Sequence, residues 1–177
     1  MARSSANSDR CATCRRRATR GAGGRCDRCW QIAVGSTREV DRTEAARLVD
    51  LPPWVLATLA TDRSPLVRAE VARRDDLPDR IIAALANPAT EPARTVLRRI
   101  ARHPRLFAHA HALIRTDDLF TLRHVAQNPT CPPETLALLA RHPDQTVHRW
   151  ARARVVGAAL DVQQRHRLPV GLRHLLM

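Results

Sequence analysis

The 177-residue sequence contains no lysine and no tyrosine, and aromatic residues make up only 3% of it. Such a shortage of aromatic and other strand-forming residues argues against an all-β protein. No apolar run approaches the roughly 20 residues that a membrane-spanning helix needs. The first residues, MARSSANSDR, lack the apolar stretch of a secretory signal. We therefore expect a cytoplasmic, bacterial-type protein without membrane segments, in which cysteines are reduced or metal-bound rather than disulfide-linked.

All 30 basic residues are arginine, and against 17 acidic residues they give a formal net charge of +13. Apolar residues reach 44% of the chain, much of it alanine, which favours closely packed helices around a real core. The length suits one domain, or one domain with a small appendage. Arginine in place of lysine is also typical of GC-rich coding, so the choice of arginine alone carries little functional weight.

Four of the five cysteines form the pattern C-x2-C-x11-C-x2-C, namely Cys11, Cys14, Cys26 and Cys29. Two residues between cysteines let both sulfurs face one metal ion, and the glycine-containing segment between the pairs can loop back to complete a tetrahedron. Residues 1–35 are therefore predicted to be a zinc knuckle or ribbon-like module with a structural zinc ion. An iron–sulfur cluster also takes four cysteines, and two chance pairs in a disordered tail are the remaining alternative.

Five other conspicuous residues receive structural interpretations. Cys131 occupies a repeat position that leucine otherwise fills, so it is predicted to be a small buried residue. His103 and His142 lie in similar Arg-His-Pro turns and are predicted to stabilise those turns. Trp54 and Trp150 lie on the repeat pattern and are predicted to belong to the core.

Residues after 50 are internally repetitive. The segments LPPWVLATLA (51–60), LPDRIIAALA (77–86) and CPPETLALLA (131–140) share a proline after the first residue and a closing Leu-Ala. Their apolar residues fall on one helical stripe, and proline suits the first turn of a helix. LFAHAHALI (106–114) is a shorter copy without the proline, and LPVGLRHLLM (168–177) resembles a final half-unit.

A second helix is predicted after each copy, with an apolar-Ala pair as its anchor. The anchors are Val71-Ala72, Ile100-Ala101, Val125-Ala126 and Trp150-Ala151, and they are separated by 29, 25 and 25 residues. A period of about 25 residues built from two short helices predicts an all-α solenoid of four to five two-helix repeats. The predicted units are a cap helix at 36–50, repeats at 51–76, 77–105, 106–130 and 131–156, and a C-terminal half-repeat at 157–177.

The repeat LPxxxLxxLA, followed by a Val-Arg-x-x-Val-Ala segment at residues 67–72, resembles the leucine-rich repeat variant family. The resemblance covers residues 51–156 well and implies a right-handed superhelix of alternating α and 3₁₀ helices. One member of that family carries an N-terminal cysteine-ligated 4Fe–4S module, which implies a cluster as the alternative to zinc here. The third unit and the 29-residue second unit depart from the family and look more like HEAT-type helical hairpins.

The positive charge gathers in two predicted places. Residues 1–30 carry eight arginines and two aspartates, and the arginines between the knuckles are predicted to meet phosphate: Arg15, Arg16, Arg17, Arg20 and Arg25. Positions two residues before and after the second-helix anchors lie on one helix face. Stacked repeats would align arginines there into a stripe that includes His148: Arg73, Arg98, Arg102, Arg123 and Arg152. The alternative in both places is an ordinary solvated basic surface.

These patterns leave three functional classes. We favour a non-enzymatic repeat protein that contacts DNA or RNA through the knuckle and the arginine stripe. A protein-interaction scaffold is the alternative, and the apolar C-terminal half-repeat could also mediate self-association. An enzyme would resemble the HEAT-like alkylpurine DNA glycosylases. For that chemistry Asp117 and Asp118 are candidates only by elimination, and the sequence holds no nucleophile motif, phosphate loop or catalytic metal spacing.

Overall fold

The structure is a computed structural model that describes the backbone of residues 26–167 and the side chains of residues 26–157. Within that part the chain is entirely helical, as predicted, with ten α-helices, one 3₁₀ helix and no strand. The helices are α1 (Asp27–Val34), α2 (Glu39–Ala46), α3 (Pro53–Ala60), α4 (Pro65–Val71), α5 (Asp79–Leu85), α6 (Arg94–Ile100), η1 (Phe107–His109), α7 (Ala110–Leu113), α8 (Leu119–Gln127), α9 (Pro133–Leu139) and α10 (Gln145–Arg167).

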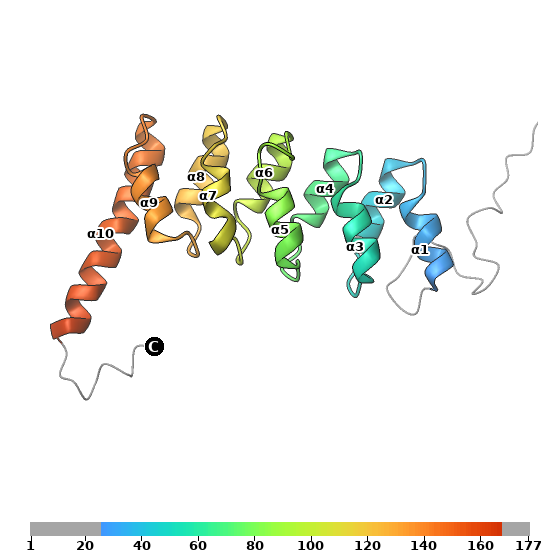
Figure 1. Ribbon diagram of the computed structural model, residues 1–177, viewed down its shortest axis with the longest axis horizontal. Coiled ribbons are helices and arrows are strands. Elements are labelled where there is room, and N and C mark those ends of the chain that lie inside the picture. Colours follow the sequence, from blue (N-terminus) through green and yellow to red (C-terminus); the bar gives the residue numbers. More distant parts are fainter. Residues whose placement is uncertain (1–25, 168–177) are drawn as a thin grey trace, which may run out of the picture.

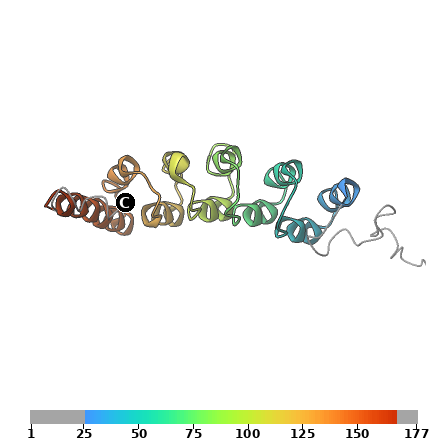
Figure 2. The same cartoon turned by 90° about the horizontal axis from the view of Figure 1, so that it is seen from below.

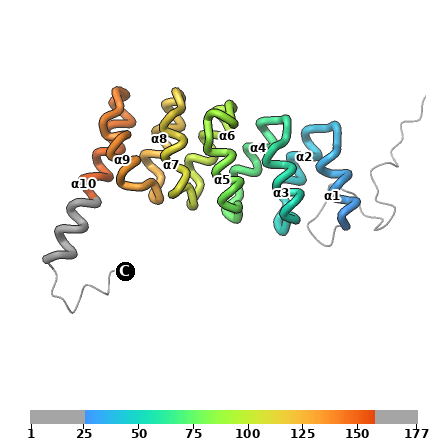
Figure 3. Tube along the Cα trace, in the orientation of Figure 1, coloured from blue at the N-terminus to red at the C-terminus, as the bar shows by residue number. Residues whose placement is uncertain are grey.

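The helices form two parallel rows that run the length of the molecule (Figures 1 and 2). The first row holds α1, α3, α5, α7 and α9, and the second row holds α2, α4, α6, α8 and α10. Each first-row helix packs against the second-row helix that follows it, and each second-row helix packs against the next one in its row. The trace in Figure 3 advances from one end to the other without turning back. Each hairpin therefore packs only against its neighbours along the row.

Local sequence explains where these short helices begin. Proline occupies the first turn of α3, α4 and α9, where its missing N–H costs nothing. The side chain of Ser64 caps α4, and that of Asp118 caps α8. The copy without the proline folds as η1 followed by the four-residue α7. Helices of seven to nine residues are unstable alone in water, so packing between hairpins holds them.

One apolar cluster runs through the row from Trp30 on α1 to Ala151 on α10. The predicted helical stripes supply it, with Val55 and Leu56 on α3 and Ile81 and Ile82 on α5 all buried. The first three predicted anchors are buried as well: Val71-Ala72, Ile100-Ala101 and Val125-Ala126. Cys131 is buried as predicted, and its burial raises the pKa of its thiol to about 11.

The prediction that both tryptophans belong to the core is wrong. Trp150 is 44% exposed because the next residue, Ala151, takes the buried anchor position on α10 and is fully buried. Trp54 is 39% exposed, and the residues at the equivalent position of the other repeat copies explain why. Its equivalents in the other copies are Arg80 and Glu134, which are also exposed. Polar residues at the same repeat position mark it as a surface position.

The structure shows what lies at two of the predicted boundaries. The boundary near residue 35 coincides with the α1–α2 turn, where Gly35 lets the backbone approach closely. A Cβ at Gly35 would lie 2.9 Å from the carbonyl oxygen of Gln31. Helix α1 nevertheless belongs to the first row and packs on α2 and α3. The boundary at residue 157 lies within α10, which continues unbroken to Arg167. No helix in residues 26–167 combines the length and apolar character needed to cross a membrane.

Candidate functional site

The second-row helices present a repeating surface, which we call the second-helix face. Each helix contributes four residues at spacings of three, one and three, so they lie on one side of the helix. The members are Val40, Thr43, Glu44 and Arg47 at α2; Leu66, Ala69, Glu70 and Arg73 at α4; Thr95, Arg98, Arg99 and Arg102 at α6; Phe120, Arg123, His124 and Gln127 at α8; and Thr146, Arg149, Trp150 and Ala153 at α10, where the buried Ala151 takes the place of Val125. Four of the five solenoid arginines of the predicted stripe belong to this set, and Arg152, which follows the buried Ala151, does not.

Two hollows open on this face. The larger, of about 700 Å³, spans α2, α4, α6 and α8. The smaller, of about 470 Å³, lies on α10 and is lined by Gln145, His148, Arg149, Arg152, Ala153 and Val156. The structure thus divides the predicted stripe between two places. Arg98 and Arg102 line the larger groove, and Arg152 lines the hollow on α10.

Each second-row helix is also tied to the next by an ion pair, and we call the four pairs the carboxylate ladder. Its rungs are Arg42–Asp62 at 2.7 Å, Arg68–Glu91 at 2.5 Å, Arg98–Asp118 at 2.6 Å and Arg123–Asp144 at 3.2 Å. Every carboxylate also accepts a backbone N–H at the start of its helix. The ladder therefore joins the body of one helix to the positive N-terminal end of its neighbour.

The rungs differ in burial along the row. The arginine side chains of the first two rungs are 5% and 14% exposed, whereas those of the last two are 38% and 29% exposed. Hydrogen bonding to Asp62 raises the pKa of Arg42, and bonding to Glu91 likewise raises the pKa of Arg68. The hydrogen bond from Arg98 holds the pKa of Asp118 far below its usual value, although burial opposes this. Asp118 is thus a permanently charged helix cap in this fold.

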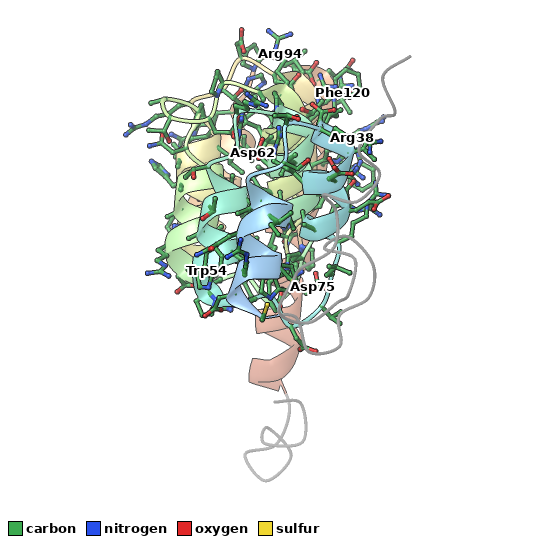
Figure 4. The ribbon with its side chains drawn as sticks, turned by 90° about the vertical axis from the view of Figure 1, so that its right-hand side faces the viewer. Arg38, Trp54, Asp62, Asp75, Arg94 and Phe120 are labelled. Carbon is green, nitrogen blue, oxygen red and sulfur yellow. The ribbon has the colours of Figure 1, made fainter. Side chains whose placement is uncertain are left out.

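A second polar network joins the opposite ends of the hairpins. Figure 4 looks along the row and shows Asp62, a member of the ladder, and Asp75, which follows Arg74 of this network, at opposite ends of the helices. The buried His103 accepts the Arg105 N–H at Nδ1, and its Nε2 lies 2.8 Å from the Arg74 carbonyl of the preceding hairpin. Asn128 has the same place one hairpin later and donates to the carbonyls of Ala101 and His103.

The predicted turn role of the histidines agrees with these contacts. Nδ1 of His103 and Nδ1 of His142 each accept the backbone N–H two residues farther on. Burial lowers the pKa of His103 and keeps the ring neutral. The two turns are not equivalent in the fold, because one follows a second-row helix and the other a first-row helix.

Charge is unevenly distributed along the row. Residues 26–93 carry nine arginines and eleven carboxylates, a net charge of −2, whereas residues 94–157 carry eleven arginines and four carboxylates, a net charge of +7. Within the described side chains no ion pair is formed by Arg149 or Arg152 on α10. The basic character of the chain is therefore concentrated on α6 to α10 in this part of the molecule.

The two described cysteines of the predicted metal site lie at the start of α1. Cys26 is its N-cap residue, Cys29 is fully buried, and their Sγ atoms are 3.7 Å apart. Cys11 and Cys14 lie outside the described residues, as do Arg15, Arg16, Arg17, Arg20 and Arg25. In residues 26–157 no three His, Cys, Asp or Glu side chains cluster in a way that could hold a metal ion. Half of the predicted ligand set is thus seen as one close pair.

The sequence interpretation overlooked the ladder and the groove, although the sequence contained signals for both. A carboxylate stands three residues before the first residue of α4 and α6 and one residue before that of α8 and α10, where a carboxylate can accept the N–H groups of the first turn. The groove lies where the stripe has Ala69 in place of an arginine. Comparison of the chain with protein-family models, with curated proteins and with solved structures found no match.

Proposed function

We propose that this protein is a non-enzymatic α-solenoid, of the leucine-rich repeat variant or HEAT-like kind, that binds nucleic acid through its basic C-terminal hairpins and a basic N-terminal zinc module. Successive hairpins of 25 to 29 residues packed in a row support the solenoid assignment. Both rows are α-helical in residues 26–167 apart from η1, which favours HEAT-like hairpins over strictly alternating α and 3₁₀ helices.

The observation that carries the nucleic-acid proposal is the net charge of +7 over residues 94–157. On α10 the exposed Arg149 and Arg152 line a hollow that contains no carboxylate. Arginine donates in a planar fork that suits phosphate oxygens, and counterion release makes such contacts favourable at low salt. The five arginines between the cysteine pairs would provide a second basic segment for phosphate contacts.

The two aspartates considered for catalysis are Asp117 and Asp118. One of them already makes structural contacts, and the other lies outside both hollows. Asp118 pairs with Arg98 and caps α8, so its carboxylate cannot act as a general base at neutral pH. Asp117 is exposed at the α7–α8 turn and lines neither hollow. The second-helix face therefore suits binding rather than base excision.

The cysteine pair fits a shared zinc ion. A tetrahedral zinc ion with Zn–S bonds of about 2.3 Å holds two thiolate sulfurs about 3.8 Å apart, and the Sγ atoms of Cys26 and Cys29 are 3.7 Å apart. In a four-iron cluster each cysteine binds a different iron, so its thiolates lie farther apart. The spacing supports zinc over a 4Fe–4S cluster, with Cys11 and Cys14 as the other two ligands.

Metal analysis of the purified full chain tests this assignment. We expect one zinc per chain and no absorbance in the visible region. Cys11→Ser should lower the zinc content, while Cys131→Ser, which alters the cysteine outside the pattern, should leave it unchanged. Brown protein that contains iron, or protein with less than one metal per several chains, would contradict the zinc proposal.

Fluorescence anisotropy with labelled single- and double-stranded DNA and RNA tests nucleic-acid binding. Affinity should fall steeply with salt, and each lost phosphate contact should flatten the logarithmic slope by about 0.9 on duplex DNA. Arg149→Gln/Arg152→Gln should therefore weaken binding and flatten the slope by about 2. The matched pair Arg63→Gln/Arg80→Gln removes two exposed arginines from the other half and should change little. Absence of binding at low salt would exclude the proposal.

A further inference from the structure

The groove on α2, α4, α6 and α8 differs in chemistry from the surface proposed for nucleic acid. At its α2 end Glu39 and Glu44 line the wall, and Glu70 on α4 adds a third carboxylate. At its α6 end the wall consists of Arg98, Arg99 and Arg102. Arg47 lines the same half as these carboxylates and pairs with Glu70. The lining therefore has three carboxylates and one arginine at α2 and α4, and three arginines at α6.

Ala69 explains why the groove exists. On α6, α8 and α10 the corresponding residues, two before a buried anchor, are Arg98, Arg123 and Arg149, and on α2 it is the small Thr43. Ala69 is 8% exposed and has no long side chain to cover α4. The groove is therefore open over α4 and walled by the arginines of α6.

Apolar side chains line the same groove and remain uncovered. Leu66 and Phe120 are 56% and 55% exposed, which is high for large apolar residues. The Phe120 ring is held in place, because the guanidinium of Arg98 lies 4.7 Å and that of Arg123 lies 5.5 Å from its centre. Figure 4 shows Phe120 on the flank of the molecule opposite Trp54. A fixed ring beside an open groove is a ready contact surface for an apolar side chain.

The charges within the groove are partly free to meet a ligand. Burial disfavours ionisation of Glu70, yet the hydrogen bond from Arg47 and the charges of Arg73 and Arg99 keep its pKa below the usual value. Arg102 donates to His124 Nε2 at 2.6 Å, and burial together with the charge of Arg102 lowers the pKa of His124. Among the described side chains no ion pair is formed by Arg99 or Arg102, although the charge of Arg99 acts on Glu70.

We propose that this groove binds a polypeptide segment of another protein whose acidic end lies over α6 and α8 and whose basic end lies over α2 and α4, with an apolar residue between them against Leu66 and Phe120. Four adjacent helices about 10 Å apart span roughly 30 Å, which an extended segment of about nine residues covers. Glu39 and Glu44 form no ion pair among the described side chains, and the α2–α4 half keeps a net negative lining charge although Arg47 pairs with Glu70. Such a half repels a phosphate backbone, so a nucleic acid does not match the whole groove.

The termini of this chain do not have the required charge pattern. Residues 1–25 contain seven arginines and one aspartate, and residues 158–177 contain three arginines and one aspartate. Neither segment has the acidic end that the α6 half of the groove calls for. We therefore assign the groove to a segment of a different protein, and its lining shares no residue with the hollow on α10.

Selection from a library of displayed random 12-residue peptides on the immobilised full chain tests the proposal. We expect selected peptides to carry an acidic cluster and a basic cluster separated by an apolar residue. Binding of a labelled, selected peptide is then measured by anisotropy. Arg99→Glu/Arg102→Glu should weaken it at least tenfold, while the control Arg80→Glu/Arg115→Glu, which reverses two arginines outside the groove, should change it less than twofold.

A second variant tests the groove by shape rather than charge. Ala69→Arg places over α4 the residue that α6 and α8 carry at the corresponding position. It should also weaken binding of the peptide at least tenfold while the helical circular dichroism is retained.

Selected peptides that are uniformly acidic, or that bind both arginine double variants equally, would overturn the proposal. A nucleic-acid ligand for the groove would overturn the proposal as well. It would be shown if single-stranded DNA displaced the peptide and if binding of that DNA were itself lost in Arg99→Glu/Arg102→Glu. Loss of nucleic-acid binding in Arg149→Gln/Arg152→Gln, with peptide binding intact, separates the two proposals.

Discussion

The two halves of the row use the same hairpin but place their arginines differently. On α2 and α4 the pairs Arg42-Thr43 and Arg68-Ala69 bury the arginine and leave a small residue on the second-helix face. On α6 and α8 a leucine is buried instead, and the next residue, Arg98 or Arg123, faces outward. A shift of one residue thus moves the guanidinium from the interior to the surface. The first half gains buried ion pairs and an open groove, and the second half gains a basic face.

The largest expected effect comes from breaking a buried rung. Arg68→Ala leaves the buried Glu91 carboxylate without its partner, and such a loss costs about 3–5 kcal/mol of unfolding free energy. Arg123→Ala breaks the half-exposed rung with Asp144, and we expect a loss of about 1 kcal/mol or less. Urea unfolding followed by circular dichroism measures both. Equal losses would show that burial does not distinguish the two halves.

The outward-facing arginine of α6 and α8 can be introduced into α4 to test whether the position of the arginine accounts for the difference between the two halves. Arg68→Leu/Ala69→Arg gives α4 the Leu-Arg pair of α6 and α8. If the shift of one residue accounts for the difference, this double variant should recover at least half of the stability that Arg68→Ala loses. The same urea titration measures it. Stability as low as that of Arg68→Ala would mean that the α4 hairpin cannot accept the outward arrangement.

Protonation of His103 should weaken the network that joins α4, α6 and α8. Burial lowers its folded-state pKa, so the unfolded chain binds the proton more readily. Its stabilising contribution is full above the unfolded pKa of about 6.5 and is lost as the pH falls from there toward the folded value. The unfolding free energy should therefore decline over this range, by less than the loss in Arg68→Ala.

The matched control for this pH effect lies one hairpin away. His103→Asn introduces the residue that stands at the equivalent position, Asn128, which makes similar bonds to backbone carbonyls but does not titrate. The difference in unfolding free energy between wild type and this variant should depend on pH between about 5 and 7. A difference that stays constant over this range would contradict the assignment of the effect to His103.

The smallest effect is expected at Trp54, on the exposed side of the first row. Trp54→Arg introduces the residue type that Arg80 provides at the equivalent position of the next repeat. Surface substitutions of this kind change the unfolding free energy by no more than about 0.5 kcal/mol. Thermal unfolding of the variant checks this expectation. A loss of several degrees would show that the indole packs against the hairpin despite its exposure.

Periodicity made the helices, the buried stripes and the first three anchors predictable, because helix spacing and burial repeat with the sequence. Arg98 and Arg102 lie on one face for the same reason, whereas Arg152 follows the buried Ala151 and lines the separate hollow on α10. The ladder could not, because its rungs join residues 20 to 23 positions apart in different hairpins, and their pairing depends on how the hairpins stack. The groove exists because Ala69 has no long side chain to cover α4. Sequence reasoning that looks for charged residues does not notice a small residue such as alanine.

The bonds that link one hairpin to the next span only 20 to 29 residues of chain. Such a low contact order allows folding within about microseconds to milliseconds, whereas the ribosome adds about 5–20 residues each second. Each new hairpin therefore folds onto the one before it while the next is still being synthesised. The order in which the described hairpins assemble is therefore set by translation and runs from α1 toward α10.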